Sequence, residues 1–372
     1  MGSTTARRLG VGVLVAGVAL SAAACGSSKK SNTGSGGPTS APVGSAAATG
    51  AAQDIFANAV AKLSSGDAAT VTIKLAATAD ELKAFTSASG LTKTPLSDAT
   101  LEAIRGASIS FATHAEAGDL KTAAGTGKTD TDFTLNVSGS ALLDIRYLGG
   151  SKQAFLKVDA SKIAGLLNKQ IPSQLAAFGA QPQFAFIKDA LDGKWLELQG
   201  LAAVLQQFKS RTNGTASPSA APAVGASDLA TKLLDALTTD VSATDAGSTD
   251  KGEHLVLTAS LKKLGTNVKA FVDSVPVGSL AGGRLSQLGT GPDKNVSIDA
   301  YVKDGALTSL VLDYDQFAPA DKASLVAGQK LPIEFDFSSA SGDTGAPSGA
   351  TAVDLSKLAA QFGPLLGSQL GG

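Results

Sequence analysis

The chain has 372 residues, a formal net charge of −1 and only 17% charged residues. This near-neutral balance gives no electrostatic reason to expect a nucleic acid or an anionic surface as partner. The sequence holds one cysteine. It therefore cannot form an internal disulfide, and its stability must come from a packed core.

The N-terminus has the organisation of an export signal. Arg7-Arg8 precede the apolar stretch 9–20, which is too short to span a bilayer, and small residues lead to Cys25. The segment resembles a bacterial lipoprotein signal with its lipobox. That resemblance implies that residues 1–24 are removed by cleavage between Ala24 and Cys25. It also implies that the Cys25 thiol carries a diacylglycerol.

Two features leave room for another interpretation. Ala22 stands where a lipobox usually has leucine, and Ala22-Ala23-Ala24 also fits the A-x-A pattern that releases a secreted protein. Arg7-Arg8 could suggest twin-arginine export, but the surrounding residues fit that motif poorly. We favour lipidation because the single cysteine falls at the lipobox position.

A lipidated Cys25 would anchor the protein. Each buried methylene contributes about 0.8 kcal/mol, so two or more acyl chains such as palmitate hold a protein firmly on a bilayer. Beyond the signal, no stretch is long enough for a transmembrane helix. We therefore expect the chain on the extracytoplasmic face of the cell membrane, held there by lipid.

Residues 25–53 follow as the modified cysteine and a tether of Gly, Ser, Ala, Thr and Pro. Such a segment buries too little apolar surface to offset its ordering entropy, which predicts a flexible spacer. Asp54 is the expected N-cap of a first helix. A second helix is expected near Asp80, with Leu82 and Phe85 on its apolar side.

Strands are expected where apolar and polar residues alternate. The pattern occurs at 71–75, 133–138, 143–147 and 154–158, and Gly149-Gly150 predicts a hairpin between the last two. Helical spacing then predicts helices at 161–168, 172–178 and 184–191, a strand at 194–198, and a further helix at 201–208.

Residues 211–226 are rich in Ser, Ala, Pro and Gly and predict an exposed insertion. A helix capped by Ser227, a strand at 255–259 and a helix at 264–272 follow. Strands at 296–302 and 310–314 join through Asp304-Gly305 as a second hairpin, and 331–337 forms another strand. The segment 341–372 is rich in Gly, Ser and Pro and ends in a helix for which Asp354 is the expected cap.

Strict alternation indicates strands with one buried and one wet face, and hairpins indicate antiparallel pairing. The pattern predicts an α+β fold with a curved antiparallel sheet, or half β-barrel, covered on its concave face by helices. One domain is expected over residues 54–340.

At this point the chain resembles the actinobacterial lipoproteins of the LppX/LprG kind, which are similar in fold to the carrier LolA. The resemblance is based on the lipobox cysteine, the spacer and the order of elements. It also includes the strand start Gly193-Lys194-Trp195 and the hairpin run 303–307. It implies an apolar cavity for acyl chains of lipids or lipoglycans between sheet and helices. Composition fits an open cavity and a filled core equally well.

Apolar residues of the helical middle are the candidate ligand-binding residues. We expect Trp195 to pack against a helix, and the others line either the mouth of a cavity or plain core. The set comprises Phe178, Phe184, Phe186, Trp195, Leu205 and Phe208.

Catalysis has little support in the sequence. His114 and His254 have no convincing catalytic neighbours and are expected on wet strand faces. No nucleophile elbow or phosphate loop is present, so we expect neither an enzyme nor a cofactor. The acid pairs Asp130/Asp132, Asp313/Asp315 and Glu334/Asp336 could share strand faces and bind calcium, but a solvated sheet face is the preferred interpretation.

Two functions remain after these exclusions. The first is a membrane-anchored lipoprotein that binds or carries lipid acyl chains. The alternative is a non-enzymatic envelope interaction or scaffolding lipoprotein with a filled core and an unknown protein partner.

Overall fold

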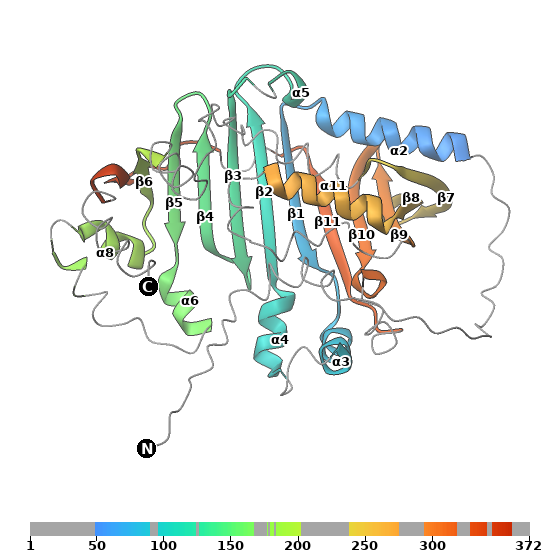
Figure 1. The fold of residues 1–372 in the computed structure, drawn as a ribbon, viewed down its shortest axis with the longest axis horizontal. Helices are drawn as coiled ribbons and strands as arrows, with labels where there is room; N and C mark the ends of the chain where they lie inside the picture. Colours follow the sequence, from blue (N-terminus) through green and yellow to red (C-terminus); the bar gives the residue numbers. More distant parts are fainter. Residues whose placement is uncertain are drawn as a thin grey trace, which may run out of the picture.

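The computed structural model describes residues 49–89, 96–123, 126–166, 177, 179–181, 184–201, 238–274, 294–317, 328–340 and 344–358. Within them the chain forms a twelve-stranded sheet with the order β12-β6-β5-β4-β3-β2-β1-β11-β10-β9-β8-β7. Neighbouring strands pair antiparallel except β12 and β6, which are parallel. The predicted α+β fold with an antiparallel sheet is confirmed (Figure 1).

The strands are β1 (Ala68–Leu75), β2 (Ala107–Ala115), β3 (Thr129–Val137), β4 (Ser140–Leu148), β5 (Gln153–Val158), β6 (Leu196–Gln199), β7 (Val241–Thr249), β8 (Gly252–Ser260), β9 (Asn295–Lys303), β10 (Ala306–Asp313), β11 (Pro332–Ser338) and β12 (Thr351–Asp354). The helices are α2 (Thr49–Ser64), α3 (Ala79–Ser89), α4 (Asp98–Arg105), α5 (Leu120–Ala123), α6 (Ala160–Leu166), α8 (Ala185–Leu191), α11 (Leu261–Ser274) and the 3₁₀ turn η4 (Tyr314–Phe317).

One face of the sheet is apolar almost from edge to edge. Residues that pair across neighbouring strands share a face, so the strand register defines continuous rows of side chains. The first row, from β8 to β5, is Leu255, Ala300, Leu310, Phe335, Ile73, Ile109, Leu135, Leu143 and Val158. The second row, from β11 to β6, is Phe337, Val71, Phe111, Phe133, Ile145, Leu156 and Leu196. The alternating residues form the opposite, polar face.

The packed core lies on the apolar face of the half formed by β1 and β7–β11. Helix α2 contacts β7 and β10, and its Phe56 and Leu63 are buried in this core. Helix α11 crosses in front of this half of the sheet in Figure 1, while α3 and α4 lie at its lower end. The Phe85 ring of α3 meets the Tyr314 ring edge-on at 5.6 Å between centroids.

Both predicted hairpins are present. The turn between β9 and β10 has Asp304 at φ 53° and Gly305 at φ 72°. Two successive residues with positive φ are the requirement of a tight hairpin turn, which glycine meets without steric cost. Gly149 and Gly150 lie in the turn between β4 and β5, as expected.

The first helix differs from its prediction. It begins at Thr49, ahead of Asp54, which therefore lies inside the helix rather than at its N-cap. Alanine-rich sequence has high helix propensity, and this extends the helix into residues that composition had assigned to the tether. The helices at Asp80 and 264–272, the α6 and α8 helices and the β6 strand are confirmed within the described residues.

Elements that the periodicity did not reveal include β2, β7 and β12. Strand β12 ends at Asp354, whose Oδ1 accepts hydrogen bonds from the amides of Ser356 and Lys357 at 3.1 Å. Asp354 thus caps a helical turn, as predicted, although a strand precedes it. The expected helices at 172–178, 201–208 and after Ser227, and the 211–226 insertion, lie outside the described residues except for the single residues 177 and 201.

Candidate functional site: an apolar hollow over one half of the sheet

The side chains of the apolar face become more exposed between β1 and β4. In the core half its side chains are sealed, with Leu255 0% and Leu310 1% exposed. Further along the same rows, Phe133, Leu135, Leu143 and Leu156 are only half-buried. Ile145, which has a paired strand on each side, is 37% exposed.

A second exposed apolar side chain lies in the helix that contacts β4. Of the described residues, the exposed large hydrophobic side chains are Ile145 in β4 and Leu166 in α6, at 37% and 43%, and α6 contacts β4. A side chain in the middle of a sheet becomes exposed only if nothing packs closely above it. The exposed apolar surface is therefore concentrated over one part of the sheet, around β4.

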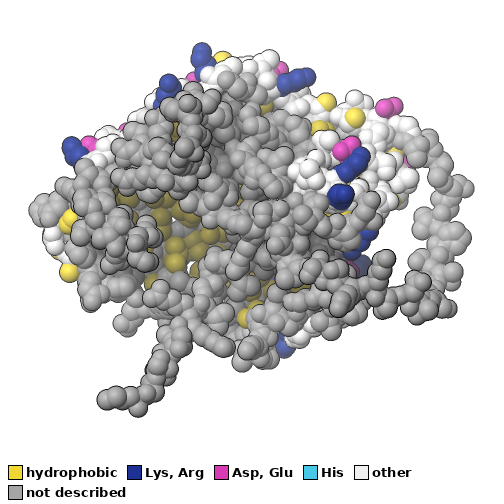
Figure 2. All heavy atoms as spheres, viewed as in Figure 1, with side chains coloured by type: hydrophobic (Ala, Val, Ile, Leu, Met, Phe, Trp, Pro, Cys, Tyr) yellow, Lys and Arg dark blue, Asp and Glu magenta, His cyan; other side chains and the backbone are white. Residues whose placement is uncertain are grey.

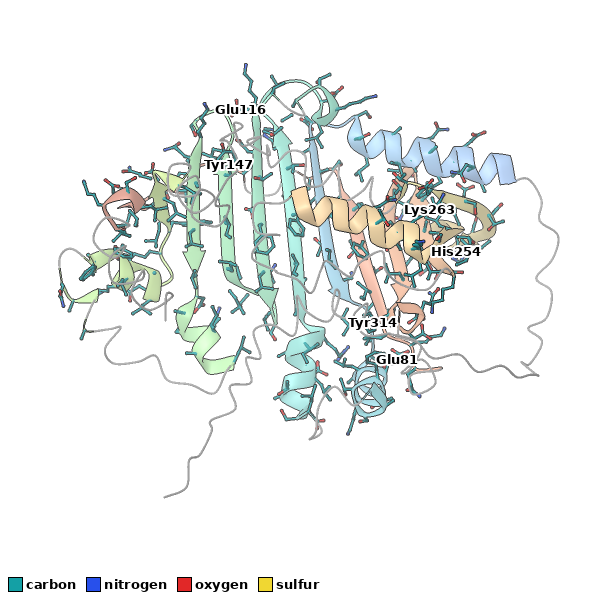
Figure 3. All side chains as sticks on the ribbon, viewed as in Figure 1. Glu81, Glu116, Tyr147, His254, Lys263 and Tyr314 are labelled. Carbon is teal, nitrogen blue, oxygen red and sulfur yellow. The ribbon has the colours of Figure 1, made fainter. Side chains whose placement is uncertain are left out.

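A hollow is visible at this place in the space-filling view. Figure 2 shows hydrophobic side chains at the bottom of an opening in the half of the molecule where β3–β5 lie in Figure 1. None of the described helices crosses β3–β5 in that view, whereas α11 crosses the other half. Figure 3 gives the same orientation, with Tyr147 near the upper end of β4 and His254 in the core half. We refer to this opening over β3–β5 as the apolar hollow.

The floor of the apolar hollow is a well-formed surface. The rings of Phe111 and Phe133 meet edge-on with centroids 5.1 Å apart. Register fixes the remaining side chains, because a slip of one residue would place polar residues there. The apolar hollow therefore offers aliphatic and aromatic contacts without a charged group from the described strands β3–β5, whose charged side chains alternate onto the opposite face.

The polar face behind the hollow carries a buried charge cluster. The Arg146 guanidinium of β4 makes ion pairs with Asp132 Oδ2 at 3.1 Å and Asp144 Oδ2 at 3.5 Å. It also lies 4.4 Å from the centre of the Trp195 ring. Burial, followed by the charge of Asp132, raises the pKa of Asp144 to about 6.

A second depression, of about 490 Å³, lies beside Lys157, Asp159 and α6. Its lining is mostly polar, and Lys162 in it pairs with Asp159 at 3.2 Å. Such a lining does not suit an acyl chain, so the apolar hollow is the better candidate for an apolar ligand.

The predicted ligand-binding residues are dispersed. Trp195 lies against Arg146, with Lys157 Nζ 5.9 Å from the centre of its ring. It precedes Leu196, which belongs to the apolar face, so Trp195 faces the opposite side. Phe184 and Phe186 are half-buried at the start of α8. Phe178, Leu205 and Phe208, together with Ala24 and Cys25, lie outside the described residues.

Sequence reasoning missed the residues that form the floor of the apolar hollow. Leu135, Leu143, Ile145 and Leu156 were assigned to strands, but nothing in their alternation separates a covered strand face from an open one. Only the packing of the whole sheet distinguishes them.

The histidines lie on the polar face, as expected. His254 Nε2 is 2.8 Å from Asp299 Oδ1, and its ring stacks on Tyr301 with centroids 5.0 Å apart. His114 of β2 is half-buried beside Asp130 of β3. Each histidine is part of a sheet-face contact remote from the apolar hollow.

The preferred interpretation of the acid pairs as a solvated face is wrong for two of their members. Asp132 is paired with Arg146, and Glu334 lies 3.3 Å from Lys74 Nζ and 2.9 Å from Lys251 Nζ, both acids being buried. Asp313 and Asp315 do not share a strand, because β10 ends at Asp313. The described residues contain no cluster of three or more possible metal ligands. Their helices also include none long and apolar enough to cross a membrane.

Comparison with known proteins gives structural matches only. No protein-family model matches the sequence, and no curated protein does. The solved structures with a similar fold include LprF from Mycobacterium bovis, with a TM-score of 0.33, 12% identity and coverage of 81% of this chain and 97% of that one. They also include the lipoprotein LppX from Mycobacterium tuberculosis, with a TM-score of 0.29, 10% identity and coverage of 80% and 98%. Both are proteins of the LppX/LprG kind that the sequence resembles. At these TM-scores the likeness says nothing of function.

Proposed function

We propose that the protein is an exported lipoprotein, anchored by lipid on Cys25, that binds lipid acyl chains in the apolar hollow. The observation that supports this most directly is the exposure of Ile145 within a continuous apolar row of a wide sheet. Exposed apolar surface costs about 25 cal/mol per Å². An acyl chain lying over β3–β5 would remove that surface from water without needing a polar partner.

The proposed role is binding rather than catalysis. The described part of the hollow floor is built from aliphatic and aromatic side chains, whereas both histidines lie on the other face of the sheet. An extended apolar chain is recognised by area and shape, which the rows on β3–β5 provide. The tether between Cys25 and the folded part would keep the hollow near the bilayer from which such chains come.

Native mass spectrometry of the protein purified from an actinobacterial host tests the cargo. We expect co-purifying lipid of defined mass. A bare protein that also fails to bind a fluorescent long-chain fatty acid would count against the carrier and favour the scaffolding alternative.

The location of the ligand is tested by filling the hollow. Ile145→Trp places a large side chain over β4 and is expected to reduce fatty-acid affinity at least tenfold. Val256→Trp is the matched control, since Val256 of β8 is half-buried and pairs with Asp299 on the polar face. Equal losses in the two variants would place the ligand elsewhere.

The anchor is tested separately with Cys25→Ser. Without the thiol no lipid can be attached, so the variant should leave the membrane fraction and enter the medium. Retention of the variant in the membrane would show that another feature holds the protein there.

A further inference from the structure

The segment between β11 and β12, which is described at 339–340 and 344–350, contacts the polar face of the sheet. β11 pairs with β1, whereas β12 pairs with β6, and four strands lie between β1 and β6 in the sheet. Near its start, the Ala340 carbonyl accepts a hydrogen bond from Thr70 Oγ1 of β1 at 2.7 Å. At its end, the Thr351 amide donates to the Trp195 carbonyl at 2.9 Å. We call residues 344–354 the strap.

Arg146 ties the start of the strap to the sheet. Its Nη1 donates to the Gly345 carbonyl at 3.2 Å, while other nitrogens of the same guanidinium face Asp132 and Asp144. All three charged residues are buried, with Asp132 7%, Asp144 8% and Arg146 6% exposed. The strap and the acid pair therefore share one cation, and a change in the charge of an acid alters how firmly that cation holds the strap.

Asp144 lies beside a second carboxylate and two cations, and one of its own oxygens is buried without a hydrogen-bond partner. On β3 the facing groups are Asp132 and Thr134, on β4 Arg146, and on β5 Lys157, which pairs with Asp144 across the strands. Asp144 Oδ1 is buried without a hydrogen-bond partner. Ionised Asp144 thus carries a poorly solvated oxygen beside a second carboxylate, a state that hydration would relieve.

We propose that the strap is a pH-responsive clasp, closed most firmly when Asp144 is protonated and loosened when Asp144 is ionised. Local opening of the strap would let water reach the carboxylate, so ionisation favours the open state. In the closed state burial raises the pKa of Asp144 to about 6, above the ordinary value of 3.8. The stabilisation by the proton is therefore complete below about pH 4 and is lost as the pH rises through about 6. This property belongs to the polar face and does not depend on a ligand in the apolar hollow.

Two readouts test the clasp on the full-length protein. Trp195 is the sole tryptophan and touches Arg146, so its fluorescence reports on the cluster without interference. Hydrogen exchange of peptides from 344–354, corrected for the intrinsic pH dependence, reports opening of the strap. If opening restores the ordinary pKa of Asp144, the opening constant should rise about tenfold between pH 5 and pH 7.5.

Asp144→Asn is the decisive variant because it keeps the shape and mimics the protonated acid. It should abolish the fluorescence transition near pH 6 and make the strap more protected than in the wild type at pH 7.5. Asp313→Asn is the matched control, since burial also raises the pKa of Asp313 but its carboxylate accepts from the Leu331 amide, away from the strap. The control should titrate like the wild type.

Three results would overturn the inference. The first is a wild-type strap whose hydrogen exchange, after correction for the intrinsic pH dependence, is the same at pH 5 and pH 7.5. This test needs no variant. The second is a pH dependence in Asp144→Asn equal to that of the wild type. The third is a strap in Asp144→Asn that opens more easily at both pH values, because loss of a merely structural contact would have that effect.

Discussion

Arg146 is the centre of the buried charge cluster on the polar face. It lies between two buried carboxylates, a backbone carbonyl and an indole ring. A buried ion pair contributes little net stability compared with an apolar replacement of the whole pair. Removal of only one partner, however, leaves uncompensated charge in the interior.

Arg146→Met should therefore lower the free energy of unfolding by about 3–5 kcal/mol at pH 7. Urea denaturation followed by circular dichroism measures the change. Lys188→Met is the control, because Lys188 Nζ pairs with Asp192 Oδ2 at 2.6 Å on the exposed surface of α8. The control should cost about 1 kcal/mol or less. Similar losses in the two variants would mean that the buried cluster carries no special energetic role.

Replacement of Asp144 is expected to have the opposite effect on the free energy of unfolding at neutral pH. Its folded-state pKa of about 6 exceeds the ordinary 3.8, so the ionised form destabilises the fold above pH 6 and the penalty vanishes below about pH 4. Asp144→Asn should raise the free energy of unfolding by about 1–3 kcal/mol at pH 7.5 and change it little at pH 4. Denaturant titrations of wild type and variant at both pH values decide this. A variant less stable than the wild type at pH 7.5 would contradict the assigned charge balance.

Among the elements, α2 shows how the core half differs from the half with the hollow. Its Phe56 is buried among the side chains of the core cluster, and the helix contacts β7 and β10 rather than β3–β5. Stability and the proposed binding should thus be separable between the two halves of the sheet.

Phe56→Ala should cost about 3–5 kcal/mol of stability because it leaves a cavity under α2. Fatty-acid affinity, measured where the variant remains folded, should stay within twofold of wild type. Asn58→Ala, on the exposed side of the same helix, controls for loss of a side chain as such. A parallel loss of affinity in Phe56→Ala would show that the ligand reaches the core half.

Local sequence predicts those elements that are determined by residues close together in the chain. The Asp304-Gly305 turn and the alternating strands β9 and β10 were predictable because turn chemistry and period-two alternation act within a few residues. Strand β7 was not, since it is an edge strand with mostly exposed small and polar residues. Strand β12 was not, since its four residues form a strand only through parallel pairing with distant β6.

The candidate site was less accessible from the sequence than the fold. The contact of Trp195 with Arg146 of β4 was not predicted, because it depends on the pairing of β6 with β5 and of β5 with β4. The sequence did not predict the exposure of Ile145, because the alternation around it is the same as that around buried residues in other strands. Exposure within a row is a property of what lies above the sheet, which periodicity does not encode.

At the scale of the molecule, the described residues combine a buried core in one half of the sheet with exposed apolar side chains in the other. If the open surface takes an acyl chain, the affinity should follow the apolar area that the chain buries. Each added methylene contributes about 0.8 kcal/mol, which corresponds to about fourfold in the dissociation constant.

A series of saturated fatty acids of increasing length therefore provides a prediction for the whole molecule. Affinity measured by displacement of a fluorescent fatty acid should rise by up to about fourfold per methylene and then level off once the chain exceeds the hollow. Ile145→Trp should reach this plateau at a shorter chain. Affinity that does not vary with chain length would mean that the head group, not the apolar hollow, determines binding.

The most direct measurement is photo-crosslinking of a fatty acid that carries a diazirine on its chain, followed by peptide mapping. If the chain binds in the apolar hollow, crosslinks should be concentrated on the apolar side chains of β3–β5, with Leu135, Leu143, Ile145 and Leu156 among the modified residues. Crosslinks confined to α2 and β7–β10, or scattered over the polar face, would contradict it.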